Sequence, residues 1–501
     1  MRVLVALLVV LPFNQWRTED RVLISDYSYI AALAASPFLL YAATPRALLI
    51  YDRPTHRWQL PVTTLDGYPR ALVRVALADR VDDAVWLGTT DGWARYDSRI
   101  RQWTNGPISG GVADLAQDAS DPASGIYLRT ANGWTFLPRG ALLPMGNRSP
   151  PANAVRPLDP QTALARSPQV DAMRALILTD PRLRTYTFTS AASTPDQNDL
   201  FFGTNGLGIV HFEGFGSRWE TLALGLHAPT AFALAPAADG VWVGTNDGLA
   251  FLSQDLSESR WIGAGARGIR FREARRVLAR AGLLWVVSEQ GVSRVDPASG
   301  RGDVLLVDEV RAFAAAPDGV LVGTTHGLVF LPDTSTVAPE RANGVPVLSL
   351  LTADNGWWVG TTAGLAFLSR DATPPRVPDR IDATPALQSP IVALGLLGDT
   401  VVAATPDQLA WRNPTTKEWT VLRPRADVGR LTVLASSPDG VWVGGDLGVA
   451  FWRIGAGTFK AIRVPIDLPA RTNDLLVSPP YLWVATDSGV VRLVREAVLQ
   501  R

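Results

Sequence analysis

The residues Val241-Trp242-Val243-Gly244-Thr245-Asn246-Asp247-Gly248-Leu249-Ala250-Phe251-Leu252 recur, with small changes, along most of this 501-residue chain. The copies can be aligned on the residue equivalent to Gly244. The aligned positions are Ala43, Gly88, Arg129, Gly203, Gly244, Val287, Gly323, Gly360, Ala404, Gly444 and Ala485. Neighbouring positions are 36 to 45 residues apart, except that 74 residues separate Arg129 from Gly203. The chain therefore contains eleven copies of one unit, with extra residues between the third and the fourth.

Each unit predicts four short β-strands. An Asp-Gly pair such as Asp239-Gly240 favours a hairpin turn, because both central residues adopt positive φ at low cost. The following Val-Trp-Val-Gly-Thr strand is apolar on both faces, as expected between two neighbouring sheets, and its Gly lets the next sheet approach closely. A Thr-x-x-Gly turn leads to the third strand, and the fourth strand has the polar alternation of an exposed edge.

Units of about 40 residues with four short strands are typical of β-propeller blades. We therefore predict an all-β fold, a β-propeller of about 11–12 four-stranded blades with a short loop and helix insertion. Two rings are favoured, with the insertion near a junction, and one large ring is the alternative. A strand within residues 21–28 could join the sheet of the last blade and hide its open edge.

The domain boundaries follow from the spacing of the units. Residues 21–138 are expected to form blades 1–3, and residues 189–501 blades 4–11. Residues 139–188 are expected to be an insertion, either a loop plus a helix or a degenerate blade. The apolar residues of 161–180 have helical spacing, which favours the first of these interpretations. The insertion is the best candidate for a domain boundary or for a lid over one face.

Residues 1–20 are interpreted as a signal peptide or an N-terminal hydrophobic segment. Met1-Arg2 precedes an apolar run over residues 3–13, which has the length of a signal-peptide core. We therefore expect a bacterial protein that is exported to the periplasm or beyond. The run is too short to cross a bilayer comfortably, so the chain is not expected to be an integral membrane protein unless residues 3–13 remain uncleaved.

The composition excludes several classes of function. There is no cysteine, which excludes disulfides, thiol catalysis and cysteine-ligated zinc. The chain has 47 basic and 47 acidic residues, and this balance gives no reason to expect nucleic acid as a partner. Nucleophile-elbow, phosphate-loop, dinucleotide and calcium-loop motifs are missing from the sequence. We therefore predict no catalytic residues, no metal site and no cofactor.

Candidate binding residues are expected where the copies differ from one another. In a propeller the connections from fourth to first strand and from second to third strand emerge on the same face, around the mouth of the central channel. Loops there vary freely on a rigid scaffold. The candidates are Asp91, His227, Asp247, Glu289, His326, Asp446 and Asp487. The alternative is that they are ordinary turn residues. Of the other histidines, His56 is expected at the surface, and His211 in a structural role.

The repeated Trp-Val-Gly-Thr-x-x-Gly-Leu after Asp-Gly closely resembles the repeat of the two-component-regulator propeller family. Members are ligand-binding sensor propellers on the extracytoplasmic side of hybrid sensor kinases, or stand-alone exported proteins. The resemblance covers nearly all of the chain apart from the N-terminal run and residues 140–184. It implies the stand-alone form, since no kinase follows the last blade, and any signalling would then pass through a separate partner.

The leading hypothesis is therefore an exported, non-catalytic β-propeller that acts as a sensor or scaffold in the cell envelope. Its partner would be an envelope protein or a polar ligand such as a glycan. The alternative is a propeller-based polysaccharide lyase or hydrolase. That activity would require His and carboxylate side chains to converge at one channel mouth in acid and base roles.

Overall fold

A computed structural model describes residues 16–500 except 181–182, 214–217, 264–268, 270, 307–308, 335–343, 371–386, 425–427 and 454–458. The apolar run over residues 3–13 lies outside the described residues. Within them the fold is almost entirely β, as predicted, and the strands form eleven antiparallel sheets. Each of the eleven repeated stretches supplies the second and third strands of one sheet.

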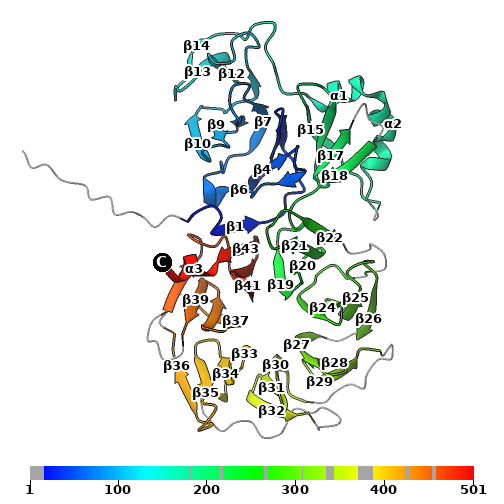
Figure 1. The fold of residues 1–501 in the computed structure, drawn as a ribbon, viewed down its shortest axis with the longest axis vertical. Helices are drawn as coiled ribbons and strands as arrows, with labels where there is room; N and C mark the ends of the chain where they lie inside the picture. Colours follow the sequence, from blue (N-terminus) through cyan, green and yellow to red (C-terminus); the bar gives the residue numbers. More distant parts are fainter. Residues whose placement is uncertain are drawn as a thin grey trace, which may run out of the picture.

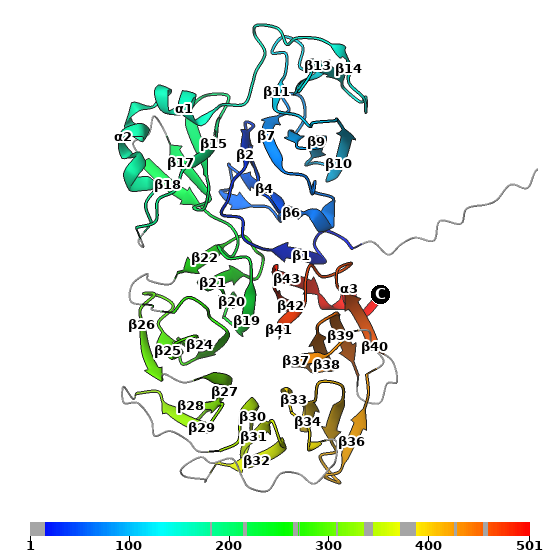
Figure 2. The same ribbon diagram turned by 180° about the vertical axis from the view of Figure 1, so that it is seen from behind.

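Seven sheets pack in a closed circuit through their innermost strands, each against the next and β41 against β19 (Figures 1 and 2). We call them the seven-sheet circuit. Their strands are β19 (Ala231–Pro236), β20 (Gly240–Thr245), β21 (Gly248–Ser253) and β22 (Ser259–Ile262); β23 (Arg276–Arg280), β24 (Leu283–Ser288), β25 (Gly291–Val295) and β26 (Gly302–Leu306); β27 (Val310–Ala316), β28 (Gly319–Thr324) and β29 (Gly327–Pro332); β30 (Val347–Ala353), β31 (Gly356–Thr361) and β32 (Gly364–Ser369); β33 (Ala393–Leu397), β34 (Thr400–Ala404), β35 (Leu409–Arg412) and β36 (Trp419–Leu422); β37 (Leu431–Ser437), β38 (Gly440–Gly445), β39 (Gly448–Trp452) and β40 (Phe459–Arg463); and β41 (Thr472–Ser478), β42 (Tyr481–Thr486) and β43 (Gly489–Val494) with β1 (Arg21–Ile24).

The other four sheets form an arc, in which β11, β7, β2 and β15 lie side by side in that order. We call it the four-sheet arc. Its strands are β2 (Ala32–Ala35), β3 (Leu39–Ala43), β4 (Ala47–Asp52), β5 (Arg57–Trp58) and β6 (Val62–Thr63); β7 (Val73–Ala78), β8 (Ala84–Thr89), β9 (Gly92–Asp97) and β10 (Gln102–Pro107); β11 (Asp114–Ala116), β12 (Gly125–Thr130), β13 (Gly133–Pro138) and β14 (Met145–Asn147); and β15 (Phe188–Ser193), β16 (Asp199–Thr204), β17 (Ile209–Glu213) and β18 (Arg218–Leu222). A short 3₁₀ helix, η1 (Thr64–Asp66), follows β6, and α3 (Arg495–Gln500) follows β43.

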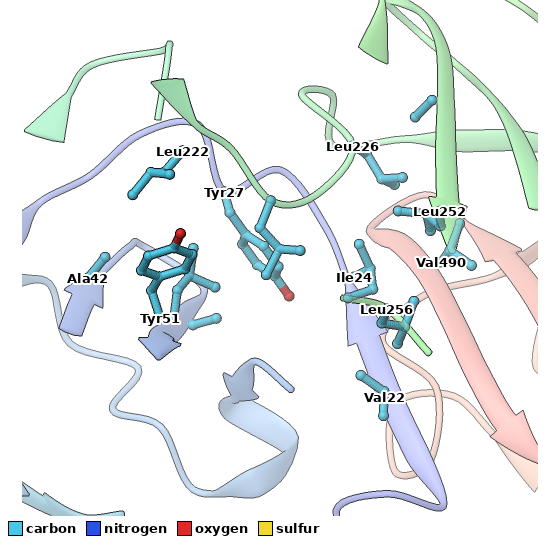
Figure 3. Packing of buried hydrophobic residues seen from close by; sticks show 14 of the residues in the cluster. Val22, Ile24, Tyr27, Ala42, Tyr51, Leu222, Leu226, Leu252, Leu256 and Val490 are labelled. Carbon is cyan, nitrogen blue, oxygen red and sulfur yellow. The ribbon is translucent and has the colours of Figure 1, made fainter. Parts of the chain in front are cut away.

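Strand β1 completes the last sheet, as its position in the sequence predicted. It pairs antiparallel with β43, with Arg21 opposite Leu493 and Ile24 opposite Val490. The chain then enters the arc, and it returns to the circuit between β18 and β19. One buried core joins the two parts: it includes Ile24 and Val490 in the circuit and Tyr51 in the arc, and Figure 3 shows Tyr27 between them.

The repeated glycine allows close approach between sheets, as expected. A Cβ atom on Gly244 would lie 2.2 Å from the carbonyl oxygen of Ala274, which leads into the next sheet. In the turn that follows, Gly248 has a φ of 99° and the Thr245 hydroxyl donates to its carbonyl over 2.9 Å. The repeated residues therefore serve the packing of one sheet on the next.

Replacing Gly244 with Ala is expected to destabilise the protein by about 1–3 kcal/mol, because the clash is with backbone, which yields poorly. The reverse change, Ala404→Gly at the equivalent position of β34, should cost only about 0.5–1 kcal/mol from backbone entropy. Thermal unfolding of both variants checks this. Equal losses in the two variants would show that the close approach at Gly244 is unimportant.

Residues 139–188 cover the two ends of the arc. Strand β14 falls within this range and pairs with β13, and two helices follow, α1 (Pro160–Arg166) and α2 (Pro168–Ile177). The helices pack through Val170 and Ile177 on the face of the β15 sheet that carries Phe202. Arg148 lies over the rings of Tyr127 and Phe136 at the other end of the arc.

The outer faces of the β11 and β15 sheets, at the two ends of the arc, are apolar because of how the repeated unit is built. Successive side chains of a strand point to opposite faces, so every sheet built from this unit has two apolar faces to bury. Phe201 faces the arc core, while its neighbour Phe202 packs against the helices. The insertion thus lies between the sheets of β11 and β15, whereas the chain passes from arc to circuit at residues 222–231.

Among the described residues, none of the helices combines the length and apolar character needed to span a bilayer.

Candidate functional site

The sequence-derived candidates lie in both parts of the molecule. Asp91 is in the turn between β8 and β9 of the arc, whereas the other six belong to the circuit or to the link that enters it. The expected face does exist. Gly248 N donates to Arg272 O over 2.7 Å, and Ala274 N donates to Thr245 O over 2.9 Å. The turn between second and third strands therefore contacts the link to the next sheet.

Several of the candidate carboxylates hold their own loops together. Glu289 accepts hydrogen bonds from the backbone N–H groups of Arg272 (2.8 Å) and Glu273 (3.1 Å). Asp487 accepts from Arg471 Nε at 2.6 Å and from Asn473 Nδ2 at 2.9 Å. These carboxylates are used as loop anchors.

The remaining candidates are more varied. Asp91 accepts a hydrogen bond of 2.7 Å from the Thr89 hydroxyl, and Asp247 lies 3.7 Å from Arg184. His227 is half-buried and stacks on Trp261, with ring centroids 5.4 Å apart; burial lowers its pKa. His326 Nδ1 lies 3.2 Å from the Thr325 hydroxyl, and Asp446 is an exposed turn residue. His227 and Asp247 lie close together, because the Trp261 indole on which His227 stacks donates a hydrogen bond of 2.9 Å to the Asp247 carbonyl oxygen. Asp91, His326 and Asp446 lie in the turns of three other sheets. None of the seven candidates lines the three cavities described below.

The largest of the three cavities that we compare, about 570 Å³, lies at the centre of the four-sheet arc. It is lined by the ends of three innermost strands and the turns that follow them, residues 33–38, 76–83, 191–195 and 197, and by residues 155–158 of the insertion. We call it the arc cavity. Because its strands contribute their C-terminal ends, the cavity lies at the end of the arc opposite to the predicted connection face.

The segment 155–158 bridges the gap between the two ends of the arc. Val155 forms an isolated bridge with Gln117, just after β11, and Leu158 forms another with Ala191 in β15. Without this segment the cavity would be open on one side. The insertion therefore supplies one wall of the arc cavity in addition to covering the end sheets.

A cluster of buried ion pairs lies next to the arc cavity. The Asp79 side chain is 0% exposed and accepts hydrogen bonds from Arg139 Nη2 (2.8 Å) and from the Trp86 indole (3.0 Å). Arg95 and Arg139 both also bind Asp82, at 2.6 and 2.7 Å. Burial raises the pKa of Asp79, but the hydrogen bonds from Arg139 and the backbone outweigh it, so the pKa is lowered overall.

Two polar side chains at the arc cavity have no such partner. Arg80 and Arg156 are exposed, and within the described residues neither has a carboxylate within 4.0 Å. Arg156 lies over the ring of Trp134, 5.2 Å from its centroid. Neither residue was predicted from the sequence. One signal was present: residues 79–83 read Asp-Arg-Val-Asp-Asp, a longer and more charged turn than the Asp-Gly of other units.

Two histidines meet at another cavity of about 290 Å³, between the β2 and β15 sheets. His56 is exposed, as predicted. His211 is buried, and its Nδ1 lies 3.0 Å from Glu220 and its Nε2 3.1 Å from Asp199. Its ring stacks on Phe201, with centroids 4.5 Å apart. Both nitrogens are thus engaged, which confirms the structural role expected for His211.

A third cavity, of about 410 Å³, lies between the two helices of the insertion and β15. A search of the described residues finds no group of three or more His, Asp or Glu side chains arranged to hold a metal ion. The arc cavity is therefore the best candidate site, because three strand ends and the insertion converge on it.

No protein-family model matches this chain, and no curated protein matches it. Three solved structures match this chain at low sequence identity and with TM-scores below 0.5. The extracellular domain of a proposed one-component system from B. thetaiotaomicron is 13% identical, with a TM-score of 0.46 over 94% of this chain and 78% of that one. The extracellular domain of a proposed hybrid two-component system from the same organism is 12% identical, with a TM-score of 0.46 over 92% and 61%. Virginiamycin B lyase from Staphylococcus aureus is 11% identical, with a TM-score of 0.44 over 53% and 95%.

Proposed function

We propose that this chain is a non-catalytic β-propeller that binds a polar ligand in the arc cavity, as a sensor or scaffold module of the cell envelope. The observation that supports this most directly is the arc cavity itself, with its volume of about 570 Å³. Cavities of roughly 300–1000 Å³ are the size that small ligands occupy. Its walls come from three strands and the insertion, so the lining is set by packed sheets rather than by one loop.

The chemistry of the lining favours binding over catalysis. A lyase or hydrolase needs a carboxylate or imidazole free to exchange a proton with substrate. The carboxylates of Asp79 and Asp82 are held by Arg95 and Arg139, and Asp83 Oδ2 accepts from Arg99 Nε at 3.0 Å. The residues that line the cavity include no histidine. These groups are suited to fixing the site and its charge.

Export is part of the proposal, and it rests on the apolar run over residues 3–13. The structure adds a constraint on where processing could occur. The small residues 31–35 resemble a late cleavage site, but Ala32–Ala35 is strand β2 and lies after β1. Cleavage there would remove β1, the strand that completes the last sheet, so we propose that any processing site lies before Arg21.

The proposal is tested by a thermal-shift screen of glycans and small metabolites against the wild type and Ser193→Trp. Ser193 lines the arc cavity, and an indole there would fill part of it. We expect compounds that raise the melting temperature of the wild type to have little effect on Ser193→Trp. Ala35→Phe, on another wall, should have the same effect if Ser193→Trp folds poorly.

The matched control is Ser109→Trp, an exposed serine in the loop between β10 and β11 on the opposite connection face. This variant should respond to ligands as the wild type does. Ligands that still stabilise both cavity variants, or that are lost in Ser109→Trp instead, would contradict binding in the arc cavity.

A further inference from the structure

His211 lies between two carboxylates on one face of the β15 sheet. Its Nε2 is 3.1 Å from Asp199 Oδ1, and its Nδ1 is 3.0 Å from Glu220 Oε1. The pairing of the strands produces this arrangement, because His211 in β17 lies directly opposite Glu220 in the neighbouring strand β18 (Figure 1). Phe201, two residues after Asp199 in β16, stacks on the ring. The imidazole is therefore held with both nitrogens facing oxygen atoms.

The two contacts require one more proton than a neutral histidine carries. Ionised carboxylates only accept hydrogen bonds, and a neutral imidazole has a single N–H group to donate. One nitrogen of a neutral His211 would therefore face a carboxylate oxygen with lone pairs on both atoms. With the extra proton bound, both nitrogens donate, and both contacts become charge-assisted hydrogen bonds. The proton belongs to the three groups together, since a protonated carboxyl beside a neutral ring would satisfy the same contacts.

The charges around the ring favour uptake of this proton. Two guanidinium groups lie on this side of the sheet: Arg53, from the β2 sheet, binds Asp199, and Arg218 lies opposite Glu213 in the strand pairing. The four carboxylates among these neighbours are those of Asp196, Asp199, Glu213 and Glu220. Four negative charges against two positive ones leave an excess of negative charge, and nearby negative charge stabilises an imidazolium.

Two further titratable groups face this region from the β2 sheet. His56 lines the same cavity of about 290 Å³, and its Nδ1 is 3.3 Å from Tyr51 Oη. Burial raises the pKa of Tyr51, and the negative charge of Glu220 acts in the same direction, so the phenol stays neutral. This contact of His56 requires no extra proton, unlike the two contacts of His211.

The two carboxylates that face His211 differ in exposure. The side chain of Asp199 is 16% exposed and also binds Arg53, whereas the side chain of Glu220 is 58% exposed. When the extra proton is lost, one N–H group remains on the ring. It stays with Asp199, because water can solvate the Glu220 carboxylate but reaches Asp199 poorly. Glu220 is therefore the group that loses its hydrogen bond.

We infer that Asp199, His211 and Glu220 form a pH-dependent clamp, which holds Glu220 while one extra proton is bound and releases it when that proton is lost. Histidine changes charge between about pH 5 and 8, so the release falls within this range. Strand β18, which carries Glu220, is the outermost strand of its sheet, and the chain passes from it to the circuit. The clamp thus makes the attachment of β18 to its sheet dependent on acidity.

The first test is NMR of the full chain with ¹⁵N-labelled histidine. The chain has four histidines, so replacing His56, His227 and His326 one at a time with Gln identifies the His211 signals. We expect an imidazolium at about pH 5.5 and, at about pH 8.5, a neutral ring with its N–H on Nε2, which faces Asp199. A His211 ring that keeps one protonation state across this range would overturn the inference. So would a neutral ring protonated on Nδ1, which faces Glu220.

The second test compares the melting temperature of Glu220→Gln with that of the wild type at the same two pH values. A glutamine amide accepts from an imidazolium more weakly than a carboxylate does, but it can also donate to the bare nitrogen of a neutral ring. The clamp stabilises the fold while the proton is bound, and this contribution is lost as the pH rises. The melting temperature of Glu220→Gln should therefore be lower by about 1–3 °C at about pH 5.5, a small loss because Glu220 is partly exposed. At about pH 8.5 it should be equal to the wild type or higher.

The matched control is Glu213→Gln, which removes the same charge from the lining of the same cavity but lies opposite Arg218 rather than His211. Its effect on the melting temperature should differ little between the two pH values. A loss in Glu220→Gln that is equal at both pH values, or no larger than the loss in Glu213→Gln at about pH 5.5, would overturn the inference. Neither test uses a ligand, so ligand binding in the arc cavity is decided separately.

Discussion

Asp79→Ala is expected to destabilise the four-sheet arc by about 3–5 kcal/mol, the usual cost of removing one partner of a buried ion pair. The side chain is 0% exposed and accepts hydrogen bonds from Arg139, Trp86 and Gln117. Its loss would leave guanidinium, indole and amide donors buried without their acceptor. Because a chain of many sheets need not unfold in one step, native-state hydrogen exchange of β7, β8 and β12 is the appropriate measurement.

The matched control is Asp83→Ala. Its ion pair with Arg99 is exposed, so the loss should be at most about 1 kcal/mol. Acid provides a second check. The pKa of Asp79 is lowered in the folded state, so its contribution is present above the unfolded value near 3.8 and is lost as the pH falls through the folded value. The difference between wild type and Asp79→Ala should therefore shrink below pH ~4. A penalty that stays constant into acid would contradict the charged role of Asp79.

Deleting residues 1–24 is expected to destabilise the seven-sheet circuit strongly, because it removes β1. Val22 and Ile24 are 2% and 0% exposed, and each buried aliphatic side chain contributes about 1.5–3 kcal/mol. The deletion also exposes the edge of β43, whose backbone groups would then pair with another chain. We expect aggregation in size-exclusion chromatography and a large fall in the melting temperature.

Deletion of residues 1–15 is the control, since it keeps β1 and the bond from the Trp16 indole to Asp467 Oδ1 at 2.8 Å. This shorter protein should be monomeric or in the same oligomeric state as the full chain, with a similar melting temperature. Equal stability of the two deletions would show that β1 is dispensable for closing the circuit.

The strands and turns could be predicted because the residues that determine them lie within each repeated unit. Trp242, Gly244 and Gly248 act within one sheet or against its next neighbour, so their roles follow from local sequence. The division of the sheets into an arc and a circuit could not be predicted in the same way. The repeated unit presents two apolar faces in every sheet, so it does not specify how many sheets close a circuit.

The candidate site depends on contacts that the repeat does not contain. The arc cavity is closed on one side by residues 155–158, which bridge β11 and β15, and nothing in the repeated unit predicts that segment. Variation between the copies is the sequence signal that predicts binding residues. At Glu289 and Asp487, however, the varied carboxylates bind their own loops, which is a sufficient physical reason for their presence. Ligand binding at the seven connection-face residues stays a prediction.

Hydrogen exchange with and without a ligand from the screen tests most directly whether the arc cavity is the binding site. We predict that a stabilising compound slows exchange in residues 33–38, 76–83, 155–158, 191–195 and 197, which line the cavity. The turns carrying Asp247, His326 and Asp487 should exchange at unchanged rates. Protection confined to those turns, with no change around the arc cavity, would contradict the account and place the site on the connection face.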